Sequence, residues 1–587
     1  MKKTLFLLVI FTLSFQINQA QTPAFPTAEG YGKYAKGGRG GKVVFVENLD
    51  DYIAYNNMEE AIPGSFRWAL KQYPGEPLTI IFRVSGTIML KPHIVNGRNV
   101  NDIRSSRPNL TIAGQTAPGE GITIRNSKVN LGGSKDLIVR NVRFRIGENA
   151  ADGTFIPGGS MGCENAMNVI FDHCVFGWSG EENITMYDNR FTTVQWSMIH
   201  EGLYDDGHGK GNRGYGGQCG GINSTWHHNL FAHNQSRTPR LNGARTENET
   251  RVFIEFINNV IFNWGSSGGI YGADVSLGTN RSHTANYIGN YYKPGPATPS
   301  TKYFFSNYIV NGATYPKWFL SDNYMLGNAA ANTDNWNAFQ IRWSGAAGTT
   351  LPTKSDLASD TLLYPPKNIY YNLKWIEYEP YRLNTITSAE EAYQSILEKV
   401  GTFNRDSVER RIIRELKDGT ATFKASLGKY GIIDKSTDAE GYLPYEQVEP
   451  PVDTDRDGMP DAWELANGLN PNDPEDRNLK TPEGYTALEV YLNSLMGEYI
   501  VPNFTGVKNI KQTFFSIFPT VVKDRLEINS ELPLSSVKIL SLKGELISEN
   551  TLKENSFVDV RNLNSGYYLI CVKSESNRKE YAKFLKN

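Results

Sequence analysis

A repeat every 30 to 33 residues constrains the fold of this chain more than any other feature of its sequence. Short runs rich in β-branched and aromatic residues recur between about residues 109 and 325, and several close on asparagine followed by two apolar residues. These closing triplets are Asn229-Leu230-Phe231, Asn259-Val260-Ile261, Asn290-Tyr291-Tyr292 and Asn323-Tyr324-Met325. A repeat of this length is typical of solenoids and propellers. One main β-run per repeat, with irregular insertions, favours a coil of stacked parallel strands.

In such a stack the asparagines of one turn lie above each other and can form a hydrogen-bonded ladder. Cys174 and Ser197 occupy the same position in two earlier runs. The composition agrees with many short strands and turns, since the 587 residues include 55 glycines, 31 tyrosines and 28 phenylalanines. A β-sandwich with irregular asparagine turns is the alternative that the pattern leaves open.

The N-terminus has the pattern of an export signal. A charged start, an apolar run from Leu5 to Phe15 and a small residue at Ala20 predict a signal peptide over residues 1–20. A membrane anchor is the alternative, but the run is shorter than the roughly 18 apolar residues that a span needs. No other segment comes close to that length, so no transmembrane segment is expected.

Charge and cysteine content exclude other classes of protein. The net charge of −2 gives no global basic field for nucleic acid, so an anionic partner must be held by a local basic cluster. Four cysteines are too few for a disulfide scaffold. Either one bridge forms among Cys163, Cys174 and Cys219, or these are buried free thiols.

After the coils the sequence changes to helical patterns. Thr387 to Glu390 predicts a capping box that starts a helix ending before Gly401, and a second helix is expected from Asp406 to Leu416. Both are expected to cover the solenoid. We therefore divide the mature chain into a β-helix with covering helices (21–445), a calcium-loop segment (446–500), a linker (501–514) and a small C-terminal β-sandwich (515–587).

The segment from Asp453 to Glu464 has the spacing of an EF-hand loop. Its predicted calcium ligands are Asp453, Asp455, Asp457, the carbonyl of Met459, Asp461 and Glu464. Calcium takes six to eight oxygen ligands, and Gly458 permits the sharp turn that such a loop needs. The alternative is a solvated acidic turn. A single loop of this kind is more often structural than regulatory, so we assign the ion to stability.

Acidic and basic residues gather on successive repeats. The acidic group comprises Glu164, Asp172 with His173, and Glu181 with Glu182; the basic groups are His208, Lys210 and Arg213, followed by Arg237, Arg240 and Arg245. Stacked coils bring residues about 30 apart onto one face, so these groups can line one groove. Asp172 and His173 are expected to be structural, hydrogen-bonded inside the stack.

Two of these stretches resemble a known family. Val169-Ile170-Phe171-Asp172-His173 and Arg237-Thr238-Pro239-Arg240 are similar to motifs of the pectate lyases of polysaccharide lyase family 1, and the similarity extends from Phe25 to about Gly295. The resemblance implies an all-β, right-handed parallel β-helix of the pectin lyase type. It also implies calcium-assisted β-elimination of an acidic plant cell-wall polysaccharide, pectate or pectin.

The same resemblance implies roles for individual residues. Arg237 matches the catalytic base and Lys210 is assigned with it; Arg240, His208, Arg213 and Arg245 are the expected substrate contacts, and Glu164, Glu181 and Glu182 the expected ligands of a catalytic calcium. The chain departs from the family at Asn242, where a further arginine is usual, and at Thr185, where a carboxylate is expected.

The C-terminal 70 residues resemble the sorting domain of the bacterial type IX secretion system. Phe518-Pro519, the turn Leu542 to Glu545 and the end Lys583 to Lys586 carry the likeness, although Thr520 stands where asparagine is usual. A carbohydrate-binding β-sandwich is the alternative. The resemblance implies a protein that is secreted or held at the surface of a Gram-negative bacterium, with the type IX machinery as partner. We expect the chain to be a monomer.

Two other functions compete with the lyase. Asp205-Asp206 and Gly207-His208-Gly209 superficially resemble elements of a β-helical polygalacturonase, whose hydrolysis needs paired carboxylates on separate coils. The second competitor is a carbohydrate-binding solenoid without catalysis, which would need no combination of Arg237, Lys210 and the acidic cluster.

Overall fold

The computed structural model describes the chain from residue 21 to its end, apart from short segments. These segments are 55–56, 92–93, 96–97, 100–102, 149–157, 243–250, 267–269, 273–281, 311–314, 345–351, 366–367, 372–373, 378–382, 384, 505–513, 531, 543 and 552–556. The predicted signal peptide (1–20), Arg245 and most of the predicted linker therefore lie outside the described residues.

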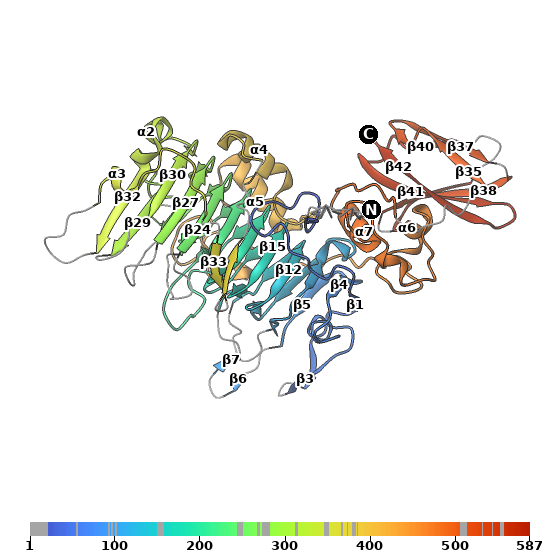
Figure 1. Cartoon of the computed structure of the whole chain (residues 1–587), viewed down its shortest axis with the longest axis horizontal. Helices are drawn as coiled ribbons and strands as arrows, with labels where there is room; N and C mark the ends of the chain where they lie inside the picture. Colours follow the sequence, from blue (N-terminus) through green and yellow to red (C-terminus); the bar gives the residue numbers. More distant parts are fainter. Residues whose placement is uncertain are drawn as a thin grey trace, which may run out of the picture.

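Three parallel sheets form a β-helix, as the repeat predicts (Figure 1). The first sheet has ten strands: β1 (Lys42–Val46), β4 (Leu78–Phe82), β9 (Leu110–Ala113), β12 (Lys135–Arg140), β15 (Met167–Asp172), β18 (Arg190–Gln195), β21 (Ile222–His227), β24 (Arg251–Ile257), β27 (Ser282–Ile288) and β30 (Lys317–Ser321). The second has nine: β5 (Gly86–Met89), β10 (Ile122–Arg125), β13 (Val142–Arg145), β16 (Val175–Gly177), β19 (Met198–His200), β22 (Leu230–Ala232), β25 (Val260–Phe262), β28 (Tyr291–Lys293) and β31 (Tyr324–Met325). The third also has nine: β8 (Ile103–Arg104), β11 (Val129–Asn130), β14 (Met161–Glu164), β17 (Glu182–Tyr187), β20 (Tyr215–Cys219), β23 (Arg240–Leu241), β26 (Ile270–Gly272), β29 (Phe305–Val310) and β32 (Phe339–Ser344).

Short hairpins and helices interrupt or flank the coils. The hairpins are β2 (Tyr52–Ala54) with β3 (Asn57–Ala61), β6 (Ile94–Val95) with β7 (Arg98–Asn99), and β33 (Asn368–Tyr371) with β34 (Lys374–Glu377). The short helices are α1 (Phe66–Ala69), α2 (Ala329–Thr333) and α3 (Lys354–Leu357), with 3₁₀ turns η1 (Gly114–Thr116), η2 (Asn335–Ala338) and η3 (Ser436–Ala439).

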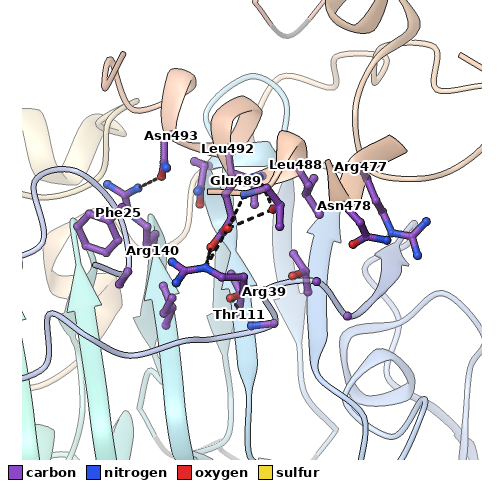
Figure 2. A pocket seen from close by; sticks show the side chains of 18 residues that line it. Phe25, Arg39, Thr111, Arg140, Arg477, Asn478, Leu488, Glu489, Leu492 and Asn493 are labelled. Atoms are coloured by element: carbon purple, nitrogen blue, oxygen red, sulfur yellow. Dashed lines mark hydrogen bonds and ion pairs between the residues drawn. The ribbon is translucent and has the colours of Figure 1, made fainter. Parts of the chain in front are cut away.

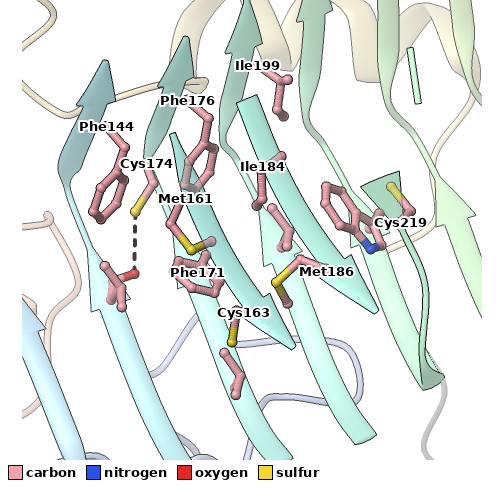
Figure 3. Packing of buried hydrophobic residues seen from close by; sticks show 14 of the residues in the cluster. Phe144, Met161, Cys163, Phe171, Cys174, Phe176, Ile184, Met186, Ile199 and Cys219 are labelled. Atoms are coloured by element: carbon pink, nitrogen blue, oxygen red, sulfur yellow. Dashed lines mark hydrogen bonds between the residues drawn. The ribbon is translucent and has the colours of Figure 1, made fainter. Parts of the chain in front are cut away.

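The interior of the β-helix is filled by apolar side chains stacked coil upon coil (Figure 3). Phe144 stacks on Phe176 with 5.5 Å between ring centroids and nearly parallel planes. Cys163, Cys174 and Cys219 contribute to this core as buried free thiols. The thiol alternative for the cysteines is thus confirmed over a disulfide.

The predicted asparagine ladder is present between the first and second sheets. Asn229, Asn259 and Asn290 each donate a side-chain hydrogen bond to the asparagine one coil further on, at 2.8–3.1 Å. Asn323 ends the series by donating to Asn335 at 2.9 Å. All five are buried. The ladder therefore satisfies polar groups at a turn where water is excluded.

Two helices cover the second sheet, α4 (Ala389–Lys399) and α5 (Ser407–Asp418) (Figure 1). Helix α4 starts one residue later than predicted, because its N-cap is Ser388 rather than Thr387. Ser388 forms a capping box with Glu391. Buried ion pairs bind α5 to strand β13: Arg143 Nε lies 2.5 Å from Glu409, and Arg145 pairs with Asp406.

The calcium-loop segment packs on the outer face of the first sheet. It contains α6 (Asp461–Ala466), η4 (Asp476–Asn478) and α7 (Ala487–Ser494). Figure 2 shows two contacts of α7 with the coils: Glu489 accepts a hydrogen bond from Arg39 Nε at 2.7 Å, and Asn493 accepts one from Arg140 at 3.1 Å. Arg140 also donates at 2.7 Å to the buried Asp172. The predicted structural role of Asp172 is confirmed.

The C-terminal module is all-β, as predicted, and forms two sheets. One consists of β35 (Phe515–Phe518), β37 (Arg525–Ser530) and β40 (Phe557–Asp559); the other of β36 (Val521–Val522), β42 (Lys579–Lys586), β41 (Gly566–Ser574), β38 (Leu534–Ser541) and β39 (Leu546–Thr551). They enclose a separate core that includes Leu526, Val537 and Phe584. Among the described residues, no helix combines the length and apolar character required to cross a membrane.

Candidate functional site

Three consecutive coils bring Glu182, Tyr215 and Arg237 together along the third sheet. Glu182 pairs in register with Tyr215 on the next coil, and Tyr215 forms a bridge with Ser236, the residue before Arg237. Parallel strands lie about 4.8 Å apart, so side chains at one register position on adjacent coils meet directly. The coil stacking thus joins residues that are more than 50 positions apart in the sequence.

Arg237 lies at the centre of this group. Its guanidinium forms an ion pair with Glu182, and Nε donates a hydrogen bond to the Tyr271 hydroxyl at 3.2 Å. Nη1 donates to Gln218 Oε1 at 3.3 Å, and the guanidinium lies over the Tyr215 ring at 4.0 Å from its centroid. These four contacts fix the plane of the guanidinium while 16% of the side chain stays exposed.

The backbone and the electrostatics of Arg237 are unusual for an arginine. Its φ of 54° is in the left-handed region, which a non-glycine residue adopts only where its surroundings impose it. Burial lowers the pKa of the guanidinium, the Tyr271 hydroxyl opposes that shift, and the nearby charge of Arg240 adds to it. The charge of Glu181 also opposes the shift, and the pKa of Arg237 stays below its usual value because burial is the largest cause.

A second group of charges surrounds Glu181. His208 Nε2, Lys210 Nζ and Arg213 Nη1 lie 3.5, 3.7 and 3.8 Å from Glu181 Oε1. Lys210 is 74% exposed at the rim, whereas Arg213 is largely buried and donates to His208 Nδ1 at 3.3 Å. Burial lowers the pKa of His208, so at neutral pH this ring adds little positive charge. Lys210 and Arg213 remain as the cations of this group.

Not all predicted residues join these groups. Glu164 pairs in register with Tyr187, five positions beyond Glu182, which is roughly 16 Å at 3.3 Å per residue. The structure therefore does not bring Glu164 together with Glu181 and Glu182, and it does not support a shared calcium site for the three. Arg240 is on β23, level with Gln218 on one neighbouring coil and Tyr271 on the other.

Sequence reasoning missed three residues that contact Arg237, namely Tyr215, Gln218 and Tyr271. Tyr271 follows Arg237 by 34 residues, close to one repeat, so the period alone offered a signal for it. Gln218 precedes Arg237 by only 19 residues, because the connection between those two strands is short. The unequal turns hide such partners from the sequence pattern.

The predicted calcium loop forms a second, separate cluster. Ligand-capable oxygens of Asp453, Asp455 and Asp457 lie within 4.8 Å of one another, and so do those of Asp457, Glu464 and Asp476. Burial, reinforced by the neighbouring carboxylates, raises the pKa of Asp457 to about 8 and that of Glu464 to about 10. Such a site strongly favours a bound cation over bare ionised carboxylates.

One predicted ligand of this loop, Asp461, has another role in the structure. Asp461 accepts hydrogen bonds from the Thr454 amide and hydroxyl, both at 2.7 Å, so its carboxylate braces the loop rather than joining the cluster. The Met459 side chain is buried in the core beneath the loop, and its carbonyl stays a predicted ligand. Asp476, outside the 12-residue motif, takes the place that Asp461 was expected to fill.

The fold and the first cluster define a class: a β-helical protein whose neighbouring coils bring arginine, lysine, tyrosine and carboxylate side chains together. Curated relatives share most of this chain. "Probable pectate lyase C" of Aspergillus flavus is 30% identical over 482 residues, covering 81% of this chain and 94% of the relative. The same-named protein of Emericella nidulans is 30% identical over 487 residues, covering 81% and 93%. The chain belongs to the pectate lyase family and is an enzyme of that family.

Two solved structures are also similar to this chain. The major allergen of cedar pollen, jun a 1, is 16% identical with a TM-score of 0.38, covering 64% of this chain and 92% of the allergen. A pectate lyase from Bacillus sp. N165 in complex with trigalacturonate is 17% identical with a TM-score of 0.34, covering 64% and 98%.

Residues 516–587 match the family model described as "Secretion system C-terminal sorting domain". The match spans both sheets of the C-terminal module. The C-terminal module is therefore a sorting domain rather than a carbohydrate-binding sandwich, and it directs the enzyme to secretion or surface display through the type IX pathway.

Proposed function

We propose that this enzyme cleaves pectate by β-elimination and that Arg237 is the base. The observation that carries the proposal is the setting of Arg237: four contacts orient its guanidinium, and burial lowers its pKa. A general base works best when its pKa is near the operating pH. A lowered pKa is therefore the property that an arginine in this role needs.

Elimination takes place on the uronate whose C4 carries the glycosidic bond that is cleaved. Arg237 takes the proton from C5, and the electron pair of that C–H bond forms the C4=C5 double bond. The C4–O4 glycosidic bond breaks, and the leaving oxygen takes a proton from water. The hydroxide that remains removes the C5 proton from Arg237, which restores the base and the water. The products are a 4,5-unsaturated uronate end and a new reducing end, with no net oxidation and no water consumed.

The cations around Glu181 are placed to bind the acidic substrate. We assign Lys210 a catalytic role beside Arg237. Uronate contacts are assigned to Arg213, His208 and Arg240. Arginine can hold a carboxylate through two parallel hydrogen bonds, whereas lysine acts as a point charge. An entering uronate would compete with Glu181 for these partners. Arg245 keeps its predicted role as a further contact.

Glu181 and Glu182 would be the ligands that the protein offers to a catalytic calcium. Carboxylates are the ligands that calcium prefers, but two of them fall short of its six to eight oxygens, so uronate carboxylates and water would supply the rest. When bound there, calcium would neutralise the uronate carboxylate and stabilise the charge that develops on C5 proton loss. The carboxylate of Glu182 also balances the charge of Arg237, with which it forms an ion pair.

Elimination is measured by the ultraviolet absorbance of the unsaturated ends released from polygalacturonate with calcium. Arg237→Ala is expected to lower kcat by about 10²–10⁴, the usual contribution of a general base. The matched control is Arg410→Ala, which removes an exposed arginine of α5 and should leave the rate unchanged. Unchanged elimination in Arg237→Ala, with normal folding by circular dichroism, would refute the assignment of the base.

The same assay separates the competing functions. New reducing ends without absorbance would indicate hydrolysis, and binding of polygalacturonate without either signal would indicate a non-catalytic solenoid. Product profiles on pectate and on methyl-esterified pectin then distinguish the preferred polymer and endo from exo cleavage. The requirement for calcium is tested by chelation. Activity should be lost on thorough chelation and should return when calcium is added, as expected if Glu181 and Glu182 bind a catalytic calcium.

A further inference from the structure

The loop near residue 453 holds buried carboxylate oxygens without hydrogen-bond partners. Both oxygens of Asp455 and of Glu464 are in this state, as is one oxygen each of Asp457 and Asp476. Asp457 and Glu464 are completely buried. Burying an unpaired carboxylate is costly, and native proteins offset it with a hydrogen bond, an ion pair or a metal. Six unsatisfied oxygens pointing to one region indicate a ligand.

We infer that a calcium-class divalent cation binds Asp453, Asp455, Asp457, Glu464 and Asp476, and that this ion is the joint that holds the sorting domain on the β-helix. All of its ligands are oxygens, which suits a hard cation and disfavours zinc or copper. This inference does not depend on the catalytic residues around Arg237 or on the function proposed above.

The ligands come from three separate places in the segment. Asp453, Asp455 and Asp457 belong to the loop, Glu464 to helix α6, and Asp476 to the 3₁₀ turn η4. An ion bound by all five cross-links these pieces. Arg83 Nη1 is 3.7 Å from Asp453 Oδ2 and offers the cluster one positive charge from the coils. Arg477, the neighbour of Asp476 in the chain, adds a second positive charge. Two guanidinium groups do not balance five carboxylates.

On one side, the loop is seated on the first coils of the β-helix. Gly458 has φ near 100°, and a Cβ built there would lie 3.1–3.4 Å from side-chain atoms of Leu488, Val43 and Ile81. Arg456 pairs with Glu47 at 2.9 Å and lies over the ring of Phe45, with 4.6 Å between its guanidinium carbon and the ring centroid. The loop therefore touches strands β1 and β4 directly.

On its other side, the same segment carries the sorting domain. Helix α6 packs against strands β41 and β42 (Figure 1). One core cluster joins Phe45 and Ile81 of the coils with Leu540 and Leu569 of the sorting domain. Tyr499 stacks on Tyr567 with 5.0 Å between ring centroids. Because the loop and α6 form the layer between the two domains, an ion that fixes them also fixes both interfaces.

Terbium luminescence on the full-length protein tests the ligand set. Terbium replaces calcium at oxygen sites, and Trp463, adjacent to Glu464 in the chain, can sensitise it. Asp476→Asn should weaken terbium binding at least tenfold, whereas Asp461→Asn should bind like the wild type because that carboxylate is engaged by Thr454. Glu181→Gln should also leave this signal unchanged. The reverse order for Asp461 and Asp476 would overturn the ligand set.

Hydrogen exchange with and without calcium tests the joint itself. In the wild type, calcium removal should speed exchange in β41 and β42 and in β1 and β4, as well as in the loop. In Asp476→Asn, exchange in these strands should be fast and should no longer respond to calcium at concentrations that saturate the wild type. A change confined to residues 453–479 would overturn the joint and leave an ion that stabilises its own loop.

Discussion

Replacing Asn259 by alanine removes one member from the middle of the asparagine ladder. Asn259 Oδ1 accepts hydrogen bonds from the Asn229 amide and side chain, both at 3.0 Å. Its Nδ2 donates to the Trp226 carbonyl at 2.8 Å and to Asn290 Oδ1 at 3.1 Å. All of these groups are buried, so water cannot replace the lost partner.

The expected magnitude follows from the groups left behind. A buried polar group without a partner costs about 1–3 kcal/mol. The Asn229 amide and the Trp226 carbonyl both lose Asn259 as a partner, which gives about 2–6 kcal/mol. Asn259→Ser should cost less, because serine already occupies the equivalent position two coils earlier, next to Asn229. There, Ser197 Oγ accepts the Cys174 amide at 3.1 Å.

Urea unfolding followed by circular dichroism measures the free energy of unfolding of each variant. The control is Asn337→Ala, which loses one exposed hydrogen bond and should cost under about 0.5 kcal/mol. Elimination at 25 °C should survive in Asn259→Ala, because the ladder lies between the first and second sheets and the catalytic cluster on the third. A cost below 1 kcal/mol, or equal costs for alanine and serine, would refute the reasoning.

Other predictions concern ionisable groups. Elimination should become faster as the pH rises above neutral, since more Arg237 is deprotonated; a pH–rate profile that is flat or falls on the alkaline side would contradict this. Burial alone would raise the pKa of Glu201, but the Arg411 guanidinium and His200 lower it well below its usual 4.5. A carboxylate whose pKa is depressed in the folded state stabilises the protein fully above its unfolded-state pKa of about 4.5. This contribution should be lost as the pH falls below about 4.5, and Glu201→Gln should flatten the acid limb of the stability curve. Arg140→Met should cost about 3–5 kcal/mol in thermal or urea unfolding, because it leaves the buried Asp172 without its charged partner; a loss below 1 kcal/mol would show that Gln195 alone satisfies this carboxylate.

The sequence by itself determined the architecture. The 30 to 33 residue spacing of Asn229, Asn259, Asn290 and Asn323 is a local, periodic signal, and in the structure these side chains bond to one another. Residues at equal spacing in a solenoid must stack, so the period alone determines which positions meet. The spacing of acidic residues after Asp453 predicted that their carboxylates gather, because a short loop brings its own side chains together, and Asp453, Asp455 and Asp457 do so in the structure.

Only the tertiary structure decided which side chains complete each site. The connections between coils differ in length, so Gln218 reaches Arg237 over 19 residues and Tyr271 over 34, while Glu164 falls about five residues out of register with Glu182. Asp476, on the separate turn η4, belongs to the carboxylate cluster of the calcium loop. Asp461 does not belong to it, because its carboxylate accepts two hydrogen bonds from Thr454. Such choices depend on distances across the fold, which a pattern along the chain does not contain.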